Sequence, residues 1–385
     1  MNYHLQLQQA FTEHFGNKAT DCYFSPGRVN LIGEHIDYNG GYVLPAAISL
    51  GIYAAIHKRN DQLINIYAAD YKEAVSFNVD EEYSKTAENT THWSDYIKAT
   101  LQVLKDNQQT LFGADIYLKS NLPIGAGLSS SAALECLIAF IFNENYYLTN
   151  KIQLAVDAQL AEQKYVGVNC GIMDQFAVAN GKKDYAMLLN CSNLAFEYIP
   201  ANFGNYTFVI INSNKARSLA ASKYNERRKE CDAAFDILKT IDIATDLCNV
   251  HEISLSYLED DILYQRAKHA VLENKRVLLA VEALEQNNME AFGQLLTESH
   301  ISLDTDYEVS CYELNMIVHY STHFDGCIGA RMTGAGFGGS CIALVQKDRI
   351  KQFISYVGKK YTEKTSLVAD FYEAEISNSV HKIIN

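Results

Sequence analysis

The sequence predicts an α+β protein with two domains, and three observations lead to that prediction. The chain has 385 residues, which is more than one hydrophobic core usually serves. Hydrophobic residues make up 48% of it, which is enough to fill sizeable cores. Long helical patterns precede a late group of strands in the second half. The composition changes at residues 200–204, so we expect domains at 1–204 and 205–385.

The first predicted domain begins with a short amphipathic helix and continues with strands rich in Val, Ile and Tyr. The predicted strands are residues 21–32, interrupted at 25–27, then 42–57, 63–69 and 114–118. Helices are predicted at 93–104, in the apolar run within 123–142, and at 151–166, where Gly167 ends the last of them. A hairpin follows at 185–189 and 194–199.

The second predicted domain separates its helices from most of its strands. A strand at 207–212 precedes three long helices, at 219–241, 258–284 and 289–299. Strands at 326–333 and 340–345 flank a glycine-rich turn, and a helix at 349–361 and a strand at 367–376 follow. This segregation is typical of an α+β domain.

Charge and cysteine content restrict the classes of partner. The net charge of −14 argues against binding nucleic acid or an anionic membrane through bulk charge. The nine cysteines are scattered, with no CxxC pair, which is typical of reduced thiols rather than of a disulfide framework. No apolar run is long enough to span a bilayer, and the N-terminus lacks a signal-peptide core. We therefore expect a cytoplasmic protein with no nucleic-acid or membrane partner.

The first candidate site is the glycine- and serine-rich loop that begins the buried helix at 123–142. Gly125 and Gly127 precede three hydroxyls, Ser129, Ser130 and Ser131. A flexible loop that enters the positive end of a helix is suited to an anion. It lacks the Lys of a Walker A loop and the third glycine of a dinucleotide fingerprint. The alternative, a helix with a glycine-rich entry and no ligand, stays open on the loop alone.

The second candidate site is a polar cluster between Gly27 and Gly41. Arg28 is a candidate cation for phosphoryl oxygens, and Glu34, His35 and Asp37 could hydrogen-bond the neighbouring hydroxyls of a sugar. The same residues could equally form a solvated turn with a surface arginine.

The third candidate site combines two carboxylates. Glu162 lies near the end of a predicted helix, off its apolar stripe, and Asp174 stands among Ile172, Met173 and Phe176. A Mg²⁺ site uses one or two carboxylates together with substrate phosphates and a hydroxyl. An exposed helical Glu, and an Asp that merely caps a helix, are the alternatives. Together the three sites indicate a magnesium-nucleotide phosphotransferase that acts on a hydroxylated substrate.

Five segments of the chain resemble one family of kinases. GRVNLIGEHIDYNGGYVLP, at 27–45, closely resembles the galactokinase signature. PIGAGLSSSAAL, at 123–134, and RMTGAGFGGS, at 331–340, resemble the second and third motifs of the galacto-, homoserine, mevalonate and phosphomevalonate (GHMP) kinase superfamily. Segments 169–176 and 222–231 are also similar to galactokinases, so the resemblance spans essentially the whole chain.

The resemblance implies a fold and a reaction. The fold has an N-terminal mixed-sheet domain and a C-terminal ferredoxin-like α+β domain, with the active site between them. The reaction transfers a phosphate from ATP to the anomeric hydroxyl of α-D-galactose, giving galactose 1-phosphate and ADP, the entry step of galactose catabolism. We expect a monomer that uses ATP and Mg²⁺.

The resemblance also implies roles for individual residues. Asp174 resembles the catalytic base, and Arg28 its cationic partner. The residues that match the sugar contacts are Glu34, His35, Ile36, Asp37, Gly171 and Tyr224, and Ile36 stands where the family usually has Thr. The residues that match the nucleotide site are Gly125, Ala126, Gly127, Leu128, Ser129, Ser130, Ser131 and Trp93. Ser131 and Glu162 resemble the Mg²⁺ ligands.

Two other functions remain as alternatives. One is a sensor that binds sugar and ATP without turnover, since a fold does not fix a function. The intact set of Arg28, Ser131, Glu162 and Asp174 argues against it. The other is the same chemistry on another sugar, such as N-acetylgalactosamine, which needs room beside the 2-hydroxyl.

Overall fold

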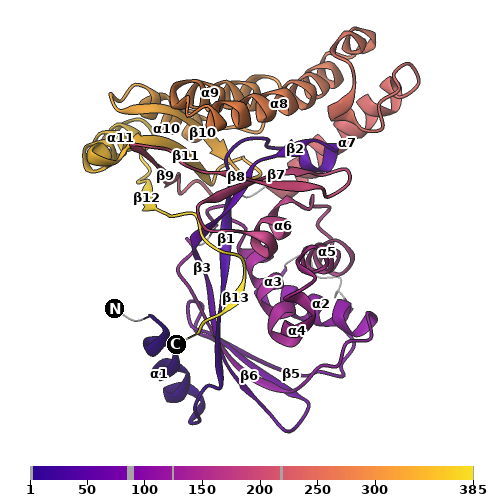
Figure 1. Cartoon of the computed structure of the whole chain (residues 1–385), viewed down its shortest axis with the longest axis vertical. Coiled ribbons are helices and arrows are strands. Elements are labelled where there is room, and N and C mark those ends of the chain that lie inside the picture. Colours follow the sequence, from indigo (N-terminus) through magenta and orange to yellow (C-terminus); the bar gives the residue numbers. More distant parts are fainter. Residues whose placement is uncertain (1–2, 85–90, 124, 217–219, 385) are drawn as a thin grey trace.

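The computed structural model describes residues 3–84, 91–123, 125–216 and 220–384. These residues form two halves stacked along the long axis of the molecule, with the long strands β1 and β3 rising from the lower half toward the upper one (Figure 1). The lower half holds a six-stranded sheet, and the upper half holds a four-stranded sheet with long helices. The predicted α+β class is confirmed.

The six-stranded sheet is mixed, in the order β13-β1-β3-β6-β4-β5. Only the neighbours β4 and β6 run parallel, and the other pairs are antiparallel. Its strands are β1 (Asp21–Asn30), β3 (Pro45–Lys58), β4 (Leu63–Ala68), β5 (Glu73–Asn78), β6 (Ala114–Ser120) and β13 (His381–Lys382). The predicted interruption at 25–27 is a shift in pairing register between Pro26 and Arg28 within one continuous strand. Such a bulge re-aims the residues beyond it, and Arg28 is one of them.

A second, three-stranded sheet lies between the two halves. It consists of β2 (Tyr42–Val43), β7 (Tyr185–Asn190) and β8 (Phe196–Pro200). The predicted strand at 42–57 is therefore divided, because its first two residues pair with β7 and the rest pairs with β1 and β6. The predicted hairpin is β7 with β8.

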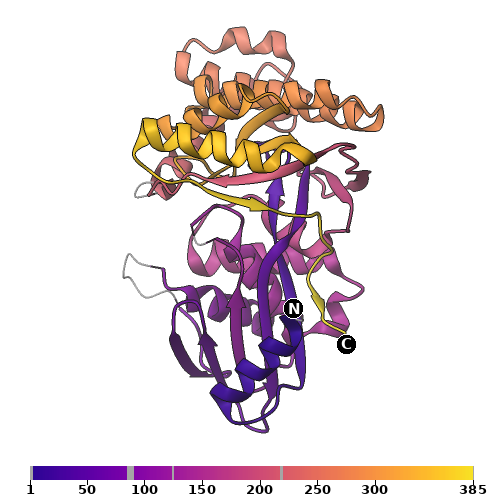
Figure 2. The same cartoon turned by 90° about the vertical axis from the view of Figure 1, so that its left-hand side faces the viewer.

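Helices cover both faces of the six-stranded sheet (Figures 1 and 2). On one side lies α1 (Tyr3–Phe15), which buries Leu7 and Phe11 against Cys22 of β1. On the other side lie α2 (Trp93–Asp106), α3 (Ser130–Phe142), α4 (Glu144–Tyr147), α5 (Lys151–Leu160) and α6 (Met173–Asn180). Every residue of α3 from Ala132 onward is buried, as its apolar sequence predicts. This buried helix is a rigid support for the glycine- and serine-rich loop at 125–131, which we call the serine loop.

The upper half has an antiparallel sheet in the order β10-β11-β9-β12. Its strands are β9 (Tyr206–Asn212), β10 (Cys327–Thr333), β11 (Ser340–Gln346) and β12 (Asp370–Glu373). Its helices are α7 (Ala220–Leu238), α8 (Asp261–Glu285), α9 (Met289–Thr305), α10 (Tyr312–Thr322) and α11 (Ile350–Thr365). The predicted helix start at Leu219 lies outside the described residues. Short 3₁₀ segments occur at η1 (Asp37–Asn39), η3 (Leu247–Asn249), η4 (Glu252–Tyr257) and η5 (Lys347–Arg349).

The end of the chain returns to the six-stranded sheet. After β12, residues 375–383 run down beside the long strands toward the N-terminal half, as the yellow segment in Figure 2 shows. The amides of Ser379 and Val380 donate to Gly181 and Val178, and β13 pairs with β1. The tail therefore joins both halves, and the domain limits 1–204 and 205–385 stay a prediction.

Two further expectations concern disulfides and membranes. All nine cysteines are free in the structure. Among the described helices, none is long and apolar enough to cross a membrane.

Candidate active site

A cavity of about 250 Å³ lies where the two halves meet. It is walled by the end of β1 and the loop after it, the segment before α6, the start of α7 and the turn between β10 and β11. The predicted residues that line it are Arg28, Glu34, His35, Asp37, Glu162, Gly171, Asp174 and Tyr224. The fold thus brings together residues that are nearly 200 positions apart in the chain.

Arg28 and Asp174 form a two-pronged ion pair at one side of this cavity. Arg28 Nε and Nη2 donate to the two carboxylate oxygens of Asp174, at 2.7 and 2.9 Å. The Ser129 hydroxyl also donates to Asp174, and Arg28 Nη1 donates to the Gly127 carbonyl at 2.9 Å. Arg28 is buried, whereas about a third of the Asp174 side chain is exposed (32%). The pair therefore holds the serine loop through Gly127 and Ser129, and it leaves part of the Asp174 carboxylate open to the cavity.

Glu34 is a buried carboxylate whose own protein already supplies most of its hydrogen bonds. Its Oε1 accepts from the Thr333 hydroxyl at 2.9 Å and from the Gly334 amide at 2.6 Å. Its Oε2 accepts from the Asn30 amide group at 2.8 Å. Because each carboxylate oxygen offers about two acceptor positions, Oε2 keeps one for a ligand in the cavity.

His35 lines the cavity, but both of its ring nitrogens are already engaged. Nδ1 lies 2.8 Å from the Tyr38 hydroxyl, and Nε2 lies 3.2 Å from the Ala335 carbonyl. Burial lowers the pKa of His35 to about 3, so the ring is neutral, and Nε2–H donates to Ala335 while Nδ1 accepts from Tyr38. The structure therefore gives the ring two protein partners that the sequence did not predict, and the sugar contact expected of His35 stays a prediction.

Ile36 departs from the sequence expectation. Its side chain is fully buried in the main hydrophobic core and is absent from the cavity lining. The carbonyl of Ile36 accepts from the amides of Asn39 and Gly41, which closes the tight turn of η1. An apolar side chain at this position stabilises the turn from the core side rather than contacting a sugar.

Asp37 and Gly171 lie against each other at the wall of the cavity. A Cβ atom on Gly171 would stand 1.8 Å from Asp37 Oδ2, so only glycine allows this approach. Burial, and then the charges of Asp174 and Glu34, raise the pKa of Asp37 to about 7. Tyr224 closes the same side, and burial raises its pKa well above the usual value, so its hydroxyl stays protonated.

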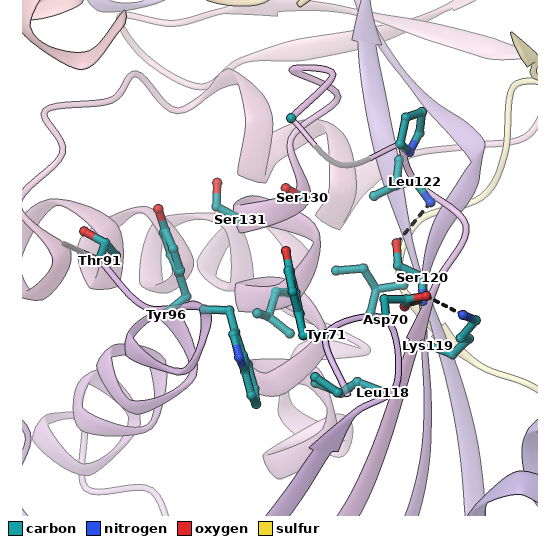
Figure 3. A pocket seen from close by; sticks show the side chains of 16 residues that line it. Asp70, Tyr71, Thr91, Tyr96, Leu118, Lys119, Ser120, Leu122, Ser130 and Ser131 are labelled. Carbon is teal, nitrogen blue, oxygen red and sulfur yellow. Dashed lines mark hydrogen bonds and ion pairs between the residues drawn. The ribbon is translucent and has the colours of Figure 1, made fainter. Parts of the chain in front are cut away.

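A second cavity, of about 350 Å³, adjoins the serine loop (Figure 3). Its lining contains the predicted residues Trp93, Gly125, Ser130 and Ser131, together with Tyr71 and Tyr96. The rings of Tyr71 and Trp93 are parallel within 4°, with centroids 6.4 Å apart. Tyr71 could not be predicted from the sequence, because a single tyrosine between two strands has no pattern of its own.

The serine loop lines the second cavity with Gly125, Ser130 and Ser131, and it reaches the first cavity only through the contact of Ser129 with Asp174. Gly125 and Gly127 adopt positive φ angles of 72° and 74°, which favour glycine. Ala126 and Leu128 are buried, backbone included, and neither lines either of these two cavities. Ser129 occupies the N-cap position of α3, but its side chain makes no cap and instead reaches Asp174. The loop thus connects the Arg28–Asp174 ion pair with the second cavity.

Glu162 is buried, which excludes the alternative of an exposed helical Glu. It lies in η2 (Ala161–Val166), a π-helical turn that continues α5 and ends at Gly167 with φ 86°. Gln175 Nε2 donates to Glu162 Oε2 at 2.7 Å, and burial followed by the charge of Asp174 raises the pKa of Glu162 to about 7. The Ser131 hydroxyl lies close enough to Glu162 to oppose that increase.

This pair of oxygen donors fits Mg²⁺. A hydroxyl and one carboxylate are a normal protein contribution when phosphates complete the coordination. No group of three or more His, Cys, Asp or Glu side chains that could hold a metal occurs in the part of the chain that the structure describes. A site here would therefore form together with the nucleotide.

Comparison with known proteins agrees with this geometry. Family models match residues 9–58 (galactokinase galactose-binding signature), 95–182 (GHMP kinases N terminal domain) and 280–363 (GHMP kinases C terminal). The galactokinase of Clostridium perfringens is 44% identical over 380 residues, 97% of each chain. That of Enterococcus faecalis is 45% identical over 385 residues, 98% of this chain and 99% of its own.

Solved structures give the same result. The structure of Lactococcus lactis galactokinase complexed with galactose superposes with a TM-score of 0.94 and 38% identity, over 99% of this chain and 100% of that one. Mevalonate kinase from Methanococcus jannaschii has a TM-score of 0.68 and 21% identity over 93% of this chain and 98% of that one, which shows a shared fold.

Proposed function

The chain belongs to the galactokinase family of GHMP kinases, and from this premise we infer that it transfers the γ-phosphate of ATP to the anomeric hydroxyl of α-D-galactose. The products are galactose 1-phosphate and ADP. The observation that carries the inference is the Arg28–Asp174 ion pair, which stands between a polar cavity and a glycine- and serine-rich loop at a helix N-terminus.

Asp174 is proposed to take the proton of the anomeric hydroxyl. The oxygen of that hydroxyl bonds to the γ-phosphorus as the bond from phosphorus to the bridging oxygen of ADP breaks, and the proton remains on the carboxylate. Phosphoryl transfer needs positioning and charge more than covalent help from the protein. Arg28 supplies a fixed cation beside the base, and its bond to the Gly127 carbonyl fixes the loop.

Galactose is proposed to contact Glu34, Asp37, Gly171 and Tyr224. Glu34 accepts a sugar hydroxyl through the open position of Oε2, and Asp37 accepts through its carboxylate. The protonated hydroxyl of Tyr224 can donate or accept. His35 lines the same cavity, and Ile36 supports the loop that presents these groups.

ATP is the co-substrate, and we propose that its phosphates lie against the loop at 125–131 and that its base enters the second cavity beside Trp93. Ser131 and Glu162 would hold Mg²⁺, which neutralises phosphate charge when it is bound. The protein itself places these two oxygens at the first turn of α3 and in η2, next to Asp174.

The remaining expectations are also proposals. The acidic net charge and the nine free cysteines support a cytoplasmic enzyme without nucleic-acid or membrane partners. We propose a monomer whose domains divide between residues 204 and 205, with the tail at 375–383 attached to the N-terminal sheet.

An assay of ADP release with a panel of sugars tests the function. Purified protein with ATP and Mg²⁺ should release ADP with galactose at a far higher kcat/KM than with glucose or N-acetylgalactosamine. Calorimetric binding of galactose without ADP release would identify a sensor. A higher kcat/KM for N-acetylgalactosamine would show that the sugar assignment is wrong.

A further inference from the structure

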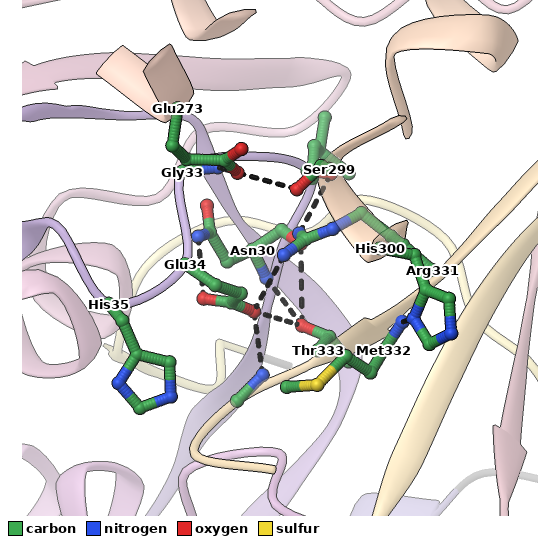
Figure 4. Close-up of polar contacts among 12 residues, drawn as sticks. Asn30, Gly33, Glu34, His35, Glu273, Ser299, His300, Arg331, Met332 and Thr333 are labelled. Carbon is green, nitrogen blue, oxygen red and sulfur yellow. Dashed lines mark hydrogen bonds and ion pairs between the residues drawn. The ribbon is translucent and has the colours of Figure 1, made fainter. Parts of the chain in front are cut away.

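Residues 30–34 lead from the end of β1 into the loop at 35–41, which we call the sugar loop. This segment is held mainly by the C-terminal half of the chain (Figure 4). The carbonyls of Asn30 and Leu31 both accept from Nη1 of Arg331, at 3.1 Å each. The Gly33 amide donates to Glu273 Oε1 at 3.0 Å. The contacts come from β10 and α8, so the sugar loop is shaped by residues about 240 to 300 positions later in the sequence.

Arg331 lies at the centre of these contacts. Its side chain is fully buried, and the bonds of Nη1 to two backbone carbonyls fix its position. Nη2 lies 3.7 Å from Glu34 Oε1, which makes an ion pair across the two halves. Among the residues that the structure describes, its Nε and Nη2 have no hydrogen-bond partner, which is unfavourable for a buried cation. An arginine with only a structural role would have hydrogen-bond partners for more of its five N–H donors. We therefore look for the role of Arg331 in its positive charge beside Glu34.

Glu34 is also bound by Thr333 and Gly334, which lie two and three residues after Arg331. The Thr333 hydroxyl and the Gly334 amide both donate to Oε1, on the side of Arg331. With Oε1 occupied by the C-terminal half, the carboxylate plane is fixed and Oε2 is the oxygen left for the cavity. The sugar-facing oxygen is therefore selected in part by Arg331 and Thr333, which do not line the cavity.

A second acid in the cluster is balanced by its own arginine. Glu273 accepts from Arg276 Nε at 2.7 Å and from the Ser299 hydroxyl, and the charge of Arg276 helps to lower the pKa of Glu273 against the effect of burial. Arg331 is thus the ion-pair partner of Glu34 and Arg276 that of Glu273, although the charge of Arg331 also helps to lower the pKa of Glu273. This separation offers a control for any test of Arg331.

We propose that Arg331 is a positioning residue for galactose recognition, which together with Thr333 holds Glu34 and the sugar loop in their binding geometry from the C-terminal half. The proposal rests on the assignment of Glu34 to the sugar site. Because the Glu34 contact would exist both in the bound substrate and in the transition state, losing its geometry raises KM for galactose and leaves kcat nearly unchanged.

Two variants test the proposal. Arg331→Met removes the cation at similar length, and Thr333→Val removes one hydroxyl at almost constant volume. We expect the galactose KM and the calorimetric Kd to rise at least about tenfold in Arg331→Met and about threefold or more in Thr333→Val. KM for ATP and kcat should stay within about threefold. Arg331→Lys, which keeps a charge but loses the two-carbonyl contact, should recover part of the affinity.

Arg276→Met is the matched control, because it removes a cation from the same buried cluster but one that pairs with Glu273. It should lower the thermal midpoint without the selective rise in galactose Kd. Equal galactose Kd in the parent, Arg331→Met and Thr333→Val overturns the proposal, as does a rise of the same size in Arg276→Met. If Arg331→Met does not fold, Thr333→Val decides alone.

Glu34→Gln separates this inference from the proposed function. If Glu34→Gln binds galactose as the parent does, the assignment of Glu34 to the sugar fails, and the role of Arg331 fails with it. If Glu34→Gln binds weakly while both positioning variants bind normally, the sugar site stands and only the role of Arg331 is wrong.

Discussion

Asp174 accepts hydrogen bonds from two nitrogens of Arg28 and from the hydroxyl of Ser129. These three donors hold the carboxylate in one orientation. The geometry therefore permits two roles for Asp174. It can remove the proton of the sugar hydroxyl, or it can hold Arg28 and the sugar in place while the charges on the phosphates drive the step.

Replacement of Asp174 by Asn distinguishes these roles, since it keeps the shape and removes the base. We expect kcat to fall by at least ~10², the usual contribution of a positioned general base. The affinities for galactose and ATP, measured by calorimetry, should change little. Asp115→Asn is a matched control, because Asp115 is also buried and paired with an arginine, Arg59, away from both cavities. Turnover of Asp174→Asn within a few-fold of the parent would leave Asp174 an orienting role only.

The raised pKa of Asp37 predicts a pH dependence of sugar binding. With a pKa of about 7, Asp37 is protonated below that pH, and a protonated carboxyl has lost an acceptor for a sugar hydroxyl. The galactose KM should therefore increase as pH falls below 7, by up to about tenfold per unit, when it is measured at saturating Mg-ATP, because the pKa of Glu162 is also raised to about 7. In Asp37→Asn the galactose KM should be high at every pH. A flat profile in the parent between pH 5 and 8 would contradict the assignment.

At the scale of single elements, α5 and η2 show what a local pattern can and cannot predict. The helix at 151–166 and its end at Gly167 follow from apolar periodicity and a glycine with positive φ. The change to π-helical geometry at Ala161 could not be predicted, because the apolar pattern of the sequence does not distinguish a π-helical turn from an α-helical one. Yet this turn carries Glu162, so local geometry at the proposed metal site depends on packing rather than on sequence pattern.

Glu162→Ala tests that element. The variant should weaken Mg²⁺-dependent nucleotide binding and reduce kcat, because one of two proposed protein ligands is lost, and galactose affinity should stay near the parent value. Titration of Mg²⁺ at fixed ATP, with calorimetry of Mg-ATP, gives the measurement. Glu298→Ala, an exposed acid on α9, controls for the loss of a charge. Unchanged Mg²⁺ dependence would place the metal elsewhere.

Strands whose formation depends on partners far away in the sequence were not predicted. β5 lies at the edge of its sheet with its side chains mostly exposed, so its sequence has little apolar alternation. β13 has only two residues and exists because β1 offers a free edge. In the site, the roles of the individual side chains of the serine loop were not predictable for the same reason. The loop itself was evident, but Ser129 turns toward Asp174, 45 positions later.

At the scale of the whole molecule, most of the candidate site could be inferred because the residues with chemical roles lie within the recognisable sequence motifs. Arg28, Asp37, Gly171 and Asp174 all meet in one cavity. The contacts that orient them were not inferable, since Arg331 and Thr333 reach Glu34 from the other half. Such pairings are set by the contacts that α8 and β10 make with the end of β1 and the residues after it.

The return of the chain end to β1 predicts a stabilising role for residues 378–385. The tail contributes the bonds of Ser379 and Val380 to Gly181 and Val178, the pairing of β13 with β1, and the bond of the Ile383 amide to Cys22. At about 1 kcal/mol of net stabilisation per hydrogen bond, their loss should destabilise the N-terminal sheet by a few kcal/mol. It would also expose an unpaired strand edge, which favours aggregation.

Deletion of residues 378–385 should therefore speed hydrogen exchange of the β1 amides, with kcat close to that of the parent at low temperature because the tail lines neither cavity. Ile384→Ala, at an exposed position of the same tail, should leave exchange unchanged. The comparison is made by mass spectrometry on the peptide that contains residues 21–30. Parent-like protection of that peptide in the deleted chain would show that β1 is held by β3 alone, and that the tail only rests on the sheet.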